Sequence, residues 1–166
     1  MEASSLRSLC KWLGYLEHAT PEDLQHPTIN VGRGNCTIFA DMVRQRTGID
    51  LQGLPWCATF VFAVHPNATT FGEPVPGVKT LMRRAKARGL WRGRDYDPRE
   101  GDLVFVRTPW FVHHVGIVLE VDDETIISID GNTSDPSGIF RPGEGGAVAL
   151  RIRSRKGRQI AGYAVI

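Results

Sequence analysis

Cys57 stands at the head of an apolar run, in the stretch PWCATFVFAV of residues 55–64. This run is too apolar for a surface element and fits a buried helix that begins just after Pro55. A helix N-terminus carries partial positive charge and free N–H groups, which favour a thiolate and lower the pKa of a thiol. Such a thiolate could attack a carbonyl carbon while the N–H groups receive the developing oxyanion. Taken alone, the stretch fits a buried structural cysteine at least as well.

A nucleophilic cysteine needs a base, and the base needs an orienting group. Three histidines lie in helix-end or loop contexts and are interpreted as surface residues: His18, His26 and His65. The remaining pair, His113 and His114, opens the apolar stretch HVGIVLEV, which reads as a strand. The base is therefore sought at the start of this strand.

The strand after the histidines, TIISID, follows a short acidic turn at residues 122–124. A three-residue loop there pairs Val121 with Thr125. Counting outward along the hairpin then sets His114 opposite Asn132. A loop of two or four residues would favour the other histidine of the pair.

In the same register, Asp130 lies diagonal to His114 on one face of the hairpin. A histidine, a carboxylate and the amide of Asn132 would then converge at one edge of the sheet. Asp130, Gly131 and Asn132 are also turn formers, so a simple turn remains the alternative for these three residues.

The rest of the chain must position these groups, and its periodicity predicts an α+β domain with helices first and strands after. Apolar spacing predicts helices over residues 4–19, 37–47 and 78–90, besides the one after Pro55. From residue 102 onward the period changes to two, and five short segments read as strands: LVFV, HVGIVLEV, TIISID, AVALRIR and IAGYAVI. Their spacing leaves no room for crossover helices, so the sheet should be mainly antiparallel.

Composition and charge argue against nucleic-acid-binding, membrane-spanning and disulfide-rich or metal-binding proteins. The 166 residues suit a single domain, and a net charge of +2 is too mild to argue for nucleic acid. No apolar run is long enough to span a bilayer, and the first twenty residues lack a secretory signal, so we expect synthesis in the cytoplasm. Three widely spaced cysteines make a poor disulfide framework and a poor metal site. A cluster of basic residues is interpreted as a solvated helix face and loop, with attraction to a polyanionic surface as the alternative: Arg83, Arg84, Lys86, Arg88, Arg92 and Arg94.

Taken in order, four stretches resemble the CHAP domain, the cysteine, histidine-dependent amidohydrolase/peptidase module of phage endolysins and bacterial cell-wall hydrolases. These stretches are GLPWCATFV, DPREGDLVFV, HHVGIVLEV and IDGNTSD. The upstream NVGRGNCTIF and the tail GGAVALRIRSRKGRQIAGYAVI extend the similarity from about Asn30 to the end of the chain. The order and spacing of the four motifs make this resemblance specific.

The resemblance implies a papain-like fold, with Cys57 as nucleophile and His114 as base. Asp130 stands where this family often has glutamate, one methylene longer, and Asn132 matches the amide two places later. Either Asp130 or Asn132 could orient His114. The chain is expected to be one catalytic domain, with an N-terminal helix at about 4–19, a core at about 30–166 and no separate wall-binding domain. We expect no metal or cofactor, because Asp41 and Asp50 are isolated and form no calcium loop.

Aromatic residues near the motifs have two interpretations each. Trp56 could line a substrate groove beside Cys57 or pack in the core. Trp110 and Phe111, in RTPWFVH, could form a cleft wall for a glycan or peptide, or simply anchor their loop.

The function implied is hydrolysis of peptidoglycan by an endolysin-like, monomeric enzyme released at phage or prophage lysis. It would cut either the N-acetylmuramoyl-L-alanine amide or a bond of the stem peptide or cross-bridge. Two alternatives stay open: a related hydrolase acting as an antibacterial toxin or peptide-processing enzyme, and a catalytically inert phage module.

Overall fold

The sheet and the helices that cover it form the framework of the protein. The computed structural model describes residues 6–26, 28–134 and 145–166. Within these ranges, three α-helices with described bounds precede the main strands: α2 (Ile38–Thr47), α3 (Cys57–Val64) and α4 (Val78–Ala87). Six strands follow: β1 (Trp91–Gly93), β2 (Leu103–Arg107), β3 (Val112–Val121), β4 (Thr125–Thr133), β5 (Ala147–Ser154) and β6 (Ile160–Ala164). Short 3₁₀ helices lie at Ser8–Trp12, Glu22–Gln25 and Ala68–Phe71.

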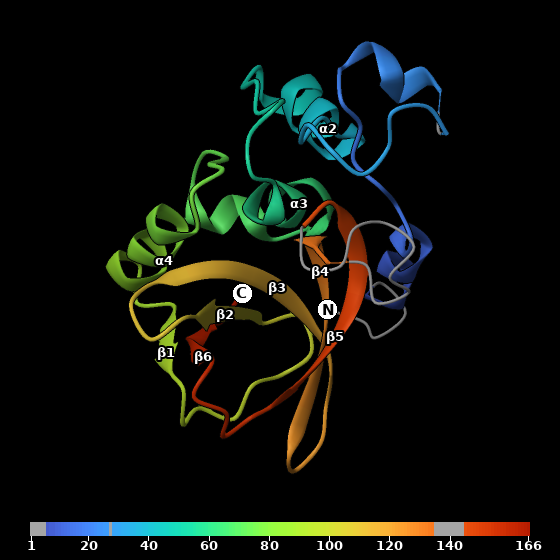
Figure 1. The fold of residues 1–166 in the computed structure, drawn as a ribbon. Helices are drawn as coiled ribbons and strands as arrows, with labels where there is room; N and C mark the ends of the chain where they lie inside the picture. Colours follow the sequence, from blue (N-terminus) through green and yellow to red (C-terminus); the bar gives the residue numbers. More distant parts are fainter. Residues whose placement is uncertain (1–5, 27, 135–144) are drawn as a thin grey trace.

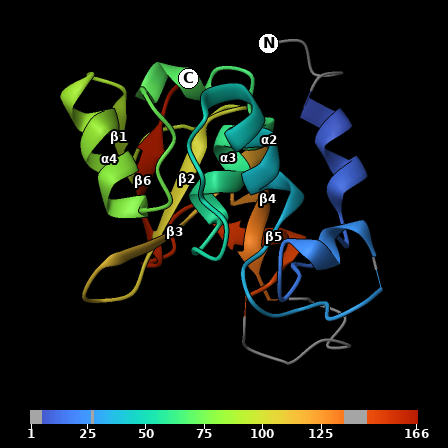
Figure 2. The same cartoon turned by 90° about the horizontal axis from the view of Figure 1, so that it is seen from above.

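The strands are arranged in the order β1-β6-β2-β3-β4-β5, and each pairing is antiparallel. Helices α3 and α4 pack on one face of this sheet, and α2 packs against α3 (Figure 1). Seen from above, α3 lies over the middle of the sheet and α4 lies beside it (Figure 2). The predicted α+β class and the antiparallel sheet are therefore confirmed, with β1 as a sixth strand besides the five predicted from residue 102 onward.

Burial occurs on both faces of the sheet. The larger apolar cluster joins the helices to the sheet and includes Phe39 of α2 and Phe60 of α3, whose rings meet edge to face at a centroid distance of 4.9 Å. A smaller cluster covers the opposite face and consists of Val104, Val118, Ile126, Ile160 and Tyr163. Strands β2 to β4 accordingly each carry buried apolar side chains on both faces.

Local capping signals account for α2. The Thr37 hydroxyl accepts a hydrogen bond from the N–H of Ala40 at 3.1 Å, as an N-cap does. Gly48 ends the helix with φ 76°, a left-handed conformation that glycine adopts without cost. The predicted helix over 37–47 is thus confirmed to within a residue.

The prediction of one long helix over 4–19 is wrong. The segment forms a 3₁₀ turn over Ser8–Trp12, and Gly14 then turns the chain at φ 82°. Beyond that point the backbone is extended, with Leu16 bridged to Ala147 and His18 to Cys36. Backbone pairing with distant segments therefore overrides the helical spacing of the leucines. Among the described residues, no helix is long and apolar enough to cross a membrane.

Candidate active site

Cys57 is the first residue of α3 and is buried against the sheet. The helix begins here because Trp56, just before it, has a non-helical backbone with φ −117° and ψ 15°, while its C=O already accepts the N–H of Phe60 at 2.8 Å. The N–H groups of the first helical turn have no partner within the helix and point toward its N-terminal end. The thiol therefore lies where a helix end favours negative charge.

Trp56 fixes this end of α3. Its indole Nε1 donates a hydrogen bond to Glu17 Oε2 at 2.6 Å, and its ring stacks on Phe39 at a centroid distance of 5.6 Å. The side chain is completely buried, so it offers no surface to a substrate. Of the two interpretations of Trp56, the structure supports packing in the core. Glu17 is a residue that sequence reasoning did not single out.

His114 lies on β3 and contacts Asp130 on β4. Its Nε2–H donates to Asp130 Oδ2 at 2.8 Å, and the imidazole also interacts with the Cys57 side chain. The carboxylate is fully buried and the imidazole nearly so. The structure thus brings together the cysteine, the histidine and the aspartate from three separate elements.

The electrostatics of this group favour charged forms. Burial by itself lowers the pKa of His114, but the hydrogen bond and charge of Asp130 and the interaction with Cys57 raise it from 6.5 to about 9. Burial would raise the pKa of Asp130, yet its contacts with His114 and Arg153 hold it well below the usual value. At neutral pH the pair is an imidazolium and a carboxylate.

Two glycines make the approach of these elements possible. Gly116 lies on β3, and a Cβ at this position would lie 2.0 Å from Asp130 Oδ1. Only a glycine there leaves room for the carboxylate, which comes from β4. A Cβ at Gly131 would lie 2.5 Å from Cβ of Phe60, so this glycine lets β4 lie against the start of α3. Backbone space, and not only side-chain chemistry, thereby sets the position of Asp130.

The hairpin between β3 and β4 reaches the predicted register by a different route. Val121 pairs with Ile126, so the connection has four residues and not the three that we predicted. A shift in register between Val118 and Glu120 compensates, and Ile117 pairs with Ile129, as the three-residue loop would require. The bulge therefore restores the alignment of His114 with the end of β4.

Arg153 and Ser128 complete the group, and sequence reasoning missed both. Arg153 Nη2 donates to Asp130 Oδ2 at 2.5 Å, and its Nη1 donates to Ser128 Oγ at 2.5 Å. The Ser128 hydroxyl in turn donates to Asp130 Oδ1 at 2.6 Å. The alternation of apolar and polar residues along β5 predicts that Ile152 is buried and Arg153 exposed. The structure shows the opposite, because Arg153 is 7% exposed and Ile152 is 71% exposed.

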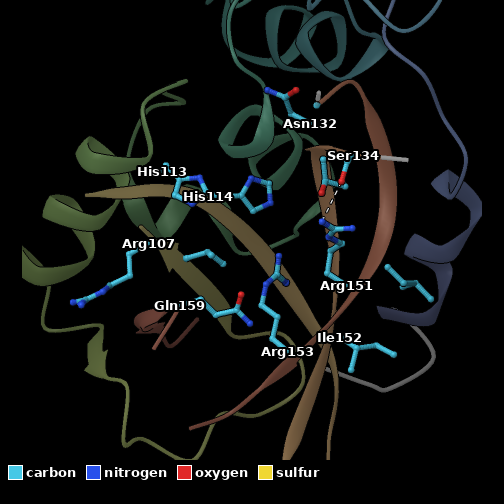
Figure 3. A pocket seen from close by; sticks show the side chains of 13 residues that line it. Arg107, His113, His114, Asn132, Ser134, Arg151, Ile152, Arg153 and Gln159 are labelled. Atoms are coloured by element: carbon cyan, nitrogen blue, oxygen red, sulfur yellow. Dashed lines mark hydrogen bonds between the residues drawn. The ribbon is translucent and has the colours of Figure 1, made fainter. Parts of the chain in front are cut away.

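Asn132 is placed differently from Asp130. It has φ 52°, a left-handed conformation that asparagine tolerates better than most residues. In Figure 3 its side chain points away from the imidazole of His114. In this structure the imidazole contacts Asp130, and Asn132 lies beside the group.

An open cavity of about 690 Å³ borders the imidazole (Figure 3). Its wall contains polar side chains from β2 to β5 and the β5–β6 turn, among them Arg107, His113, His114, Asn132, Arg151, Arg153 and Gln159. Trp110 and Phe111, just before β3, are 88% and 49% exposed, and Lys79 Nζ lies 5.4 Å from the Phe111 ring. Within the described part of the chain, no three His, Cys, Asp or Glu residues are grouped so as to hold a metal ion.

A comparison with protein families matches the CHAP domain over residues 28–132, more than half of the chain and all of the elements that carry Cys57, His114 and Asp130. The chain belongs to the CHAP domain family. This family generally comprises cysteine- and histidine-dependent amidohydrolases and peptidases of peptidoglycan. Searches of curated proteins and of solved structures gave no significant match. Arg153 lies beyond the matched residues.

Proposed function

We propose that this CHAP domain hydrolyses amide bonds of peptidoglycan through a Cys57 acyl-enzyme, as an endolysin-like enzyme does. The observation that carries the proposal is the imidazole of His114, which is held by Asp130 at 2.8 Å and also interacts with Cys57. A nucleophile, a base and an orienting carboxylate in this order are what acyl transfer requires.

The proposed reaction begins with the ion pair of the Cys57 thiolate and the His114 imidazolium. The thiolate attacks the scissile carbonyl carbon, and the N–H groups at the start of α3 receive the charge that develops on the carbonyl oxygen. His114 then donates its proton to the leaving amine as the C–N bond breaks. In the second half, His114 takes a proton from water, the hydroxide attacks the thioester, and the carboxylate product leaves with Cys57 regenerated.

Asp130 is the proposed orienting residue. Its contact with Nε2 fixes the ring and leaves the other nitrogen, Nδ1, available to the thiol, and its charge stabilises the imidazolium. Asp130 remains an ionised, hydrogen-bonded carboxylate, so in the proposed reaction it neither takes up nor releases a proton.

The proposed substrate is a peptidoglycan strand that lies across the ends of the strands beside His114. The cavity next to the imidazole and the exposed rings of Trp110 and Phe111 give the surface against which a glycan or stem peptide could pack. Both a muramoyl-L-alanine amide and a peptide bond of the stem or cross-bridge fit this chemistry.

The test is digestion of purified peptidoglycan from several wall types by the wild type and by Cys57→Ala, with mass spectrometry of the fragments. Cys36→Ala is the matched control, because Cys36 is also buried but lies before α2. We expect fragments from the wild type and Cys36→Ala only. A newly freed L-alanine amine identifies an amidase, and any other amine identifies an endopeptidase. Fragments from Cys57→Ala at the wild-type rate, or from none of the proteins, would contradict the proposal.

A further inference from the structure

The Asp130 carboxylate has two positively charged neighbours of different kinds. His114 on β3 contacts Oδ2 at 2.8 Å, and Arg153 on β5 contacts the same oxygen at 2.5 Å. Ser128 connects them further, since it donates to Oδ1 and accepts from Arg153. The guanidinium therefore spans a closed ring of hydrogen bonds with the carboxylate and the hydroxyl, which fixes the carboxylate on both oxygens.

This geometry is set by the pairing of β4 with β5. Arg153 pairs with Ile126, and its side chain extends along β4 to Ser128 and Asp130. Figure 3 shows the guanidinium extending from β5 toward His114. A lysine at the same position would keep the charge but would lack the planar fork that reaches both acceptors.

The two cations behave differently during the proposed reaction. His114 is an imidazolium before the amine leaves and a neutral imidazole afterwards, whereas the Arg153 guanidinium stays charged throughout. If His114 were the sole partner, Asp130 would become a buried charge with no opposite charge beside it at the moment of proton transfer, which is unfavourable. Such a carboxylate would compete with the leaving amine for the His114 proton.

We propose that Arg153 is a positioning residue that acts as the permanent counter-ion of Asp130, keeping it ionised whether His114 is charged or neutral. The proton of His114 is then delivered to the leaving amine and not to the carboxylate. The net charge of the cluster is then zero in both protonation states, with Cys57 and His114 as thiolate and imidazolium or as thiol and imidazole. In each state the charge of Asp130 is balanced by that of Arg153. The inference rests on the proposed hydrolase function.

Other titratable groups face this cluster and enter its pH dependence. His113, next to His114 on β3, has a centroid distance of 6.3 Å to it, and its pKa is lowered by burial and by the charges of His114 and Arg153. These effects favour the neutral form of His113. Cys57 faces the imidazole from α3, and Arg151 on β5 contacts Ser134.

The experiment compares Arg153→Met and Arg153→Lys with the wild type. Arg155→Met is the matched control, because Arg155 lies just after β5 and pairs with Asp97 at the surface, away from Asp130. We measure kcat/KM on peptidoglycan fragments across pH, and thermal unfolding of each variant. We expect Arg153→Met to lose about 100-fold in kcat/KM at neutral pH and to shift its acidic limb upward by about one pH unit or more. Arg153→Lys should keep the acidic limb near that of the wild type with a smaller loss.

A second measurement does not need turnover. Carboxyl ¹³C NMR in the inactive Cys57→Ala background follows the ionisation of Asp130 with Arg153 and with Arg153→Lys or Arg153→Met. The inference predicts an Asp130 pKa that rises when the guanidinium is removed and largely recovers with lysine. Arg153→Met with wild-type pH limbs, or an Asp130 titration that is insensitive to residue 153, overturns it. If the wild type cleaves nothing, the proposed function fails, while the NMR result still tests the counter-ion.

Discussion

Replacing Asp130 by asparagine removes the negative charge that His114 Nε2 contacts at 2.8 Å, while the side chain keeps its shape. His114 has its pKa raised from 6.5 to about 9, which corresponds to about 3 kcal/mol in favour of the imidazolium. Asp130 and Cys57 provide this preference against the effect of burial. In a Cys57→Ala background Asp130 is the remaining contributor, so its effect can be measured directly.

We expect the pKa of His114 to remain above 6.5 in Cys57→Ala and to fall below 6.5 when Asp130→Asn is added, because burial persists and lowers it. The assay is an NMR titration of the imidazole. In the active background, Asp130→Asn should lose about 100-fold or more in kcat/KM at neutral pH, since the imidazolium that protonates the leaving amine is depleted. The rate is measured by release of amines from peptidoglycan.

Asp102→Asn is the matched control, because Asp102 is also a buried carboxylate but does not contact His114. Asp102 precedes the first residue of β2, and His114 pairs with Val106, near the last residue of that strand. Thermal unfolding is followed for each variant, since Asp130→Asn leaves Arg153 buried opposite a neutral amide. A His114 pKa that stays above 6.5 without the carboxylate, together with a rate within a few-fold of the wild type, would refute the reasoning.

Two further predictions follow from the same geometry. Gly116→Ala places a Cβ 2.0 Å from Asp130 Oδ1, so we expect a loss of about 1–3 kcal/mol of stability and a large loss of activity, whereas Gly93→Ala, with open space around its Cβ, should change neither. Circular dichroism melting and the amine assay check this, and a Gly116→Ala protein that matches the wild type in both contradicts it. The raised pKa of His114 stabilises the folded state fully below pH 6.5, and this contribution is lost as pH rises through about 9. Denaturant unfolding should therefore show a steeper decline in stability over that range for the wild type than for His114→Gln, and equal slopes would count against it.

Local signals in the sequence were sufficient for the elements that begin and end on their own residues. Thr37 and Gly48 bound α2, and the apolar run after Pro55 forms α3 with Cys57 in its first turn. Period-two segments with turns between them gave the antiparallel sheet. These features depend on residues that are close together in the sequence, so each can be predicted from a single segment of the chain.

The hairpin shows how far such reasoning extends. Its turn was predicted with the wrong length, and a bulge before Glu120 returned the strands to the predicted alignment. Sequence periodicity does not reveal a bulge, because the extra residue leaves the apolar pattern on either side intact. His114 and Asp130 lie on one face of the hairpin, as predicted, but only because the bulge offsets the extra turn residue, and the sequence does not show that bulge.

By itself, the sequence determined which residue types could act together and on which elements they lie: a cysteine at a helix start, a histidine at a strand start and a carboxylate on the next strand. Only the tertiary structure decided which contacts form. Asp130 is 23 residues from Arg153, and Trp56 is 39 residues from the Glu17 that anchors it. Such pairs depend on strand order and on how the N-terminal segment returns to the sheet, which are properties of the whole packed chain and not of any segment.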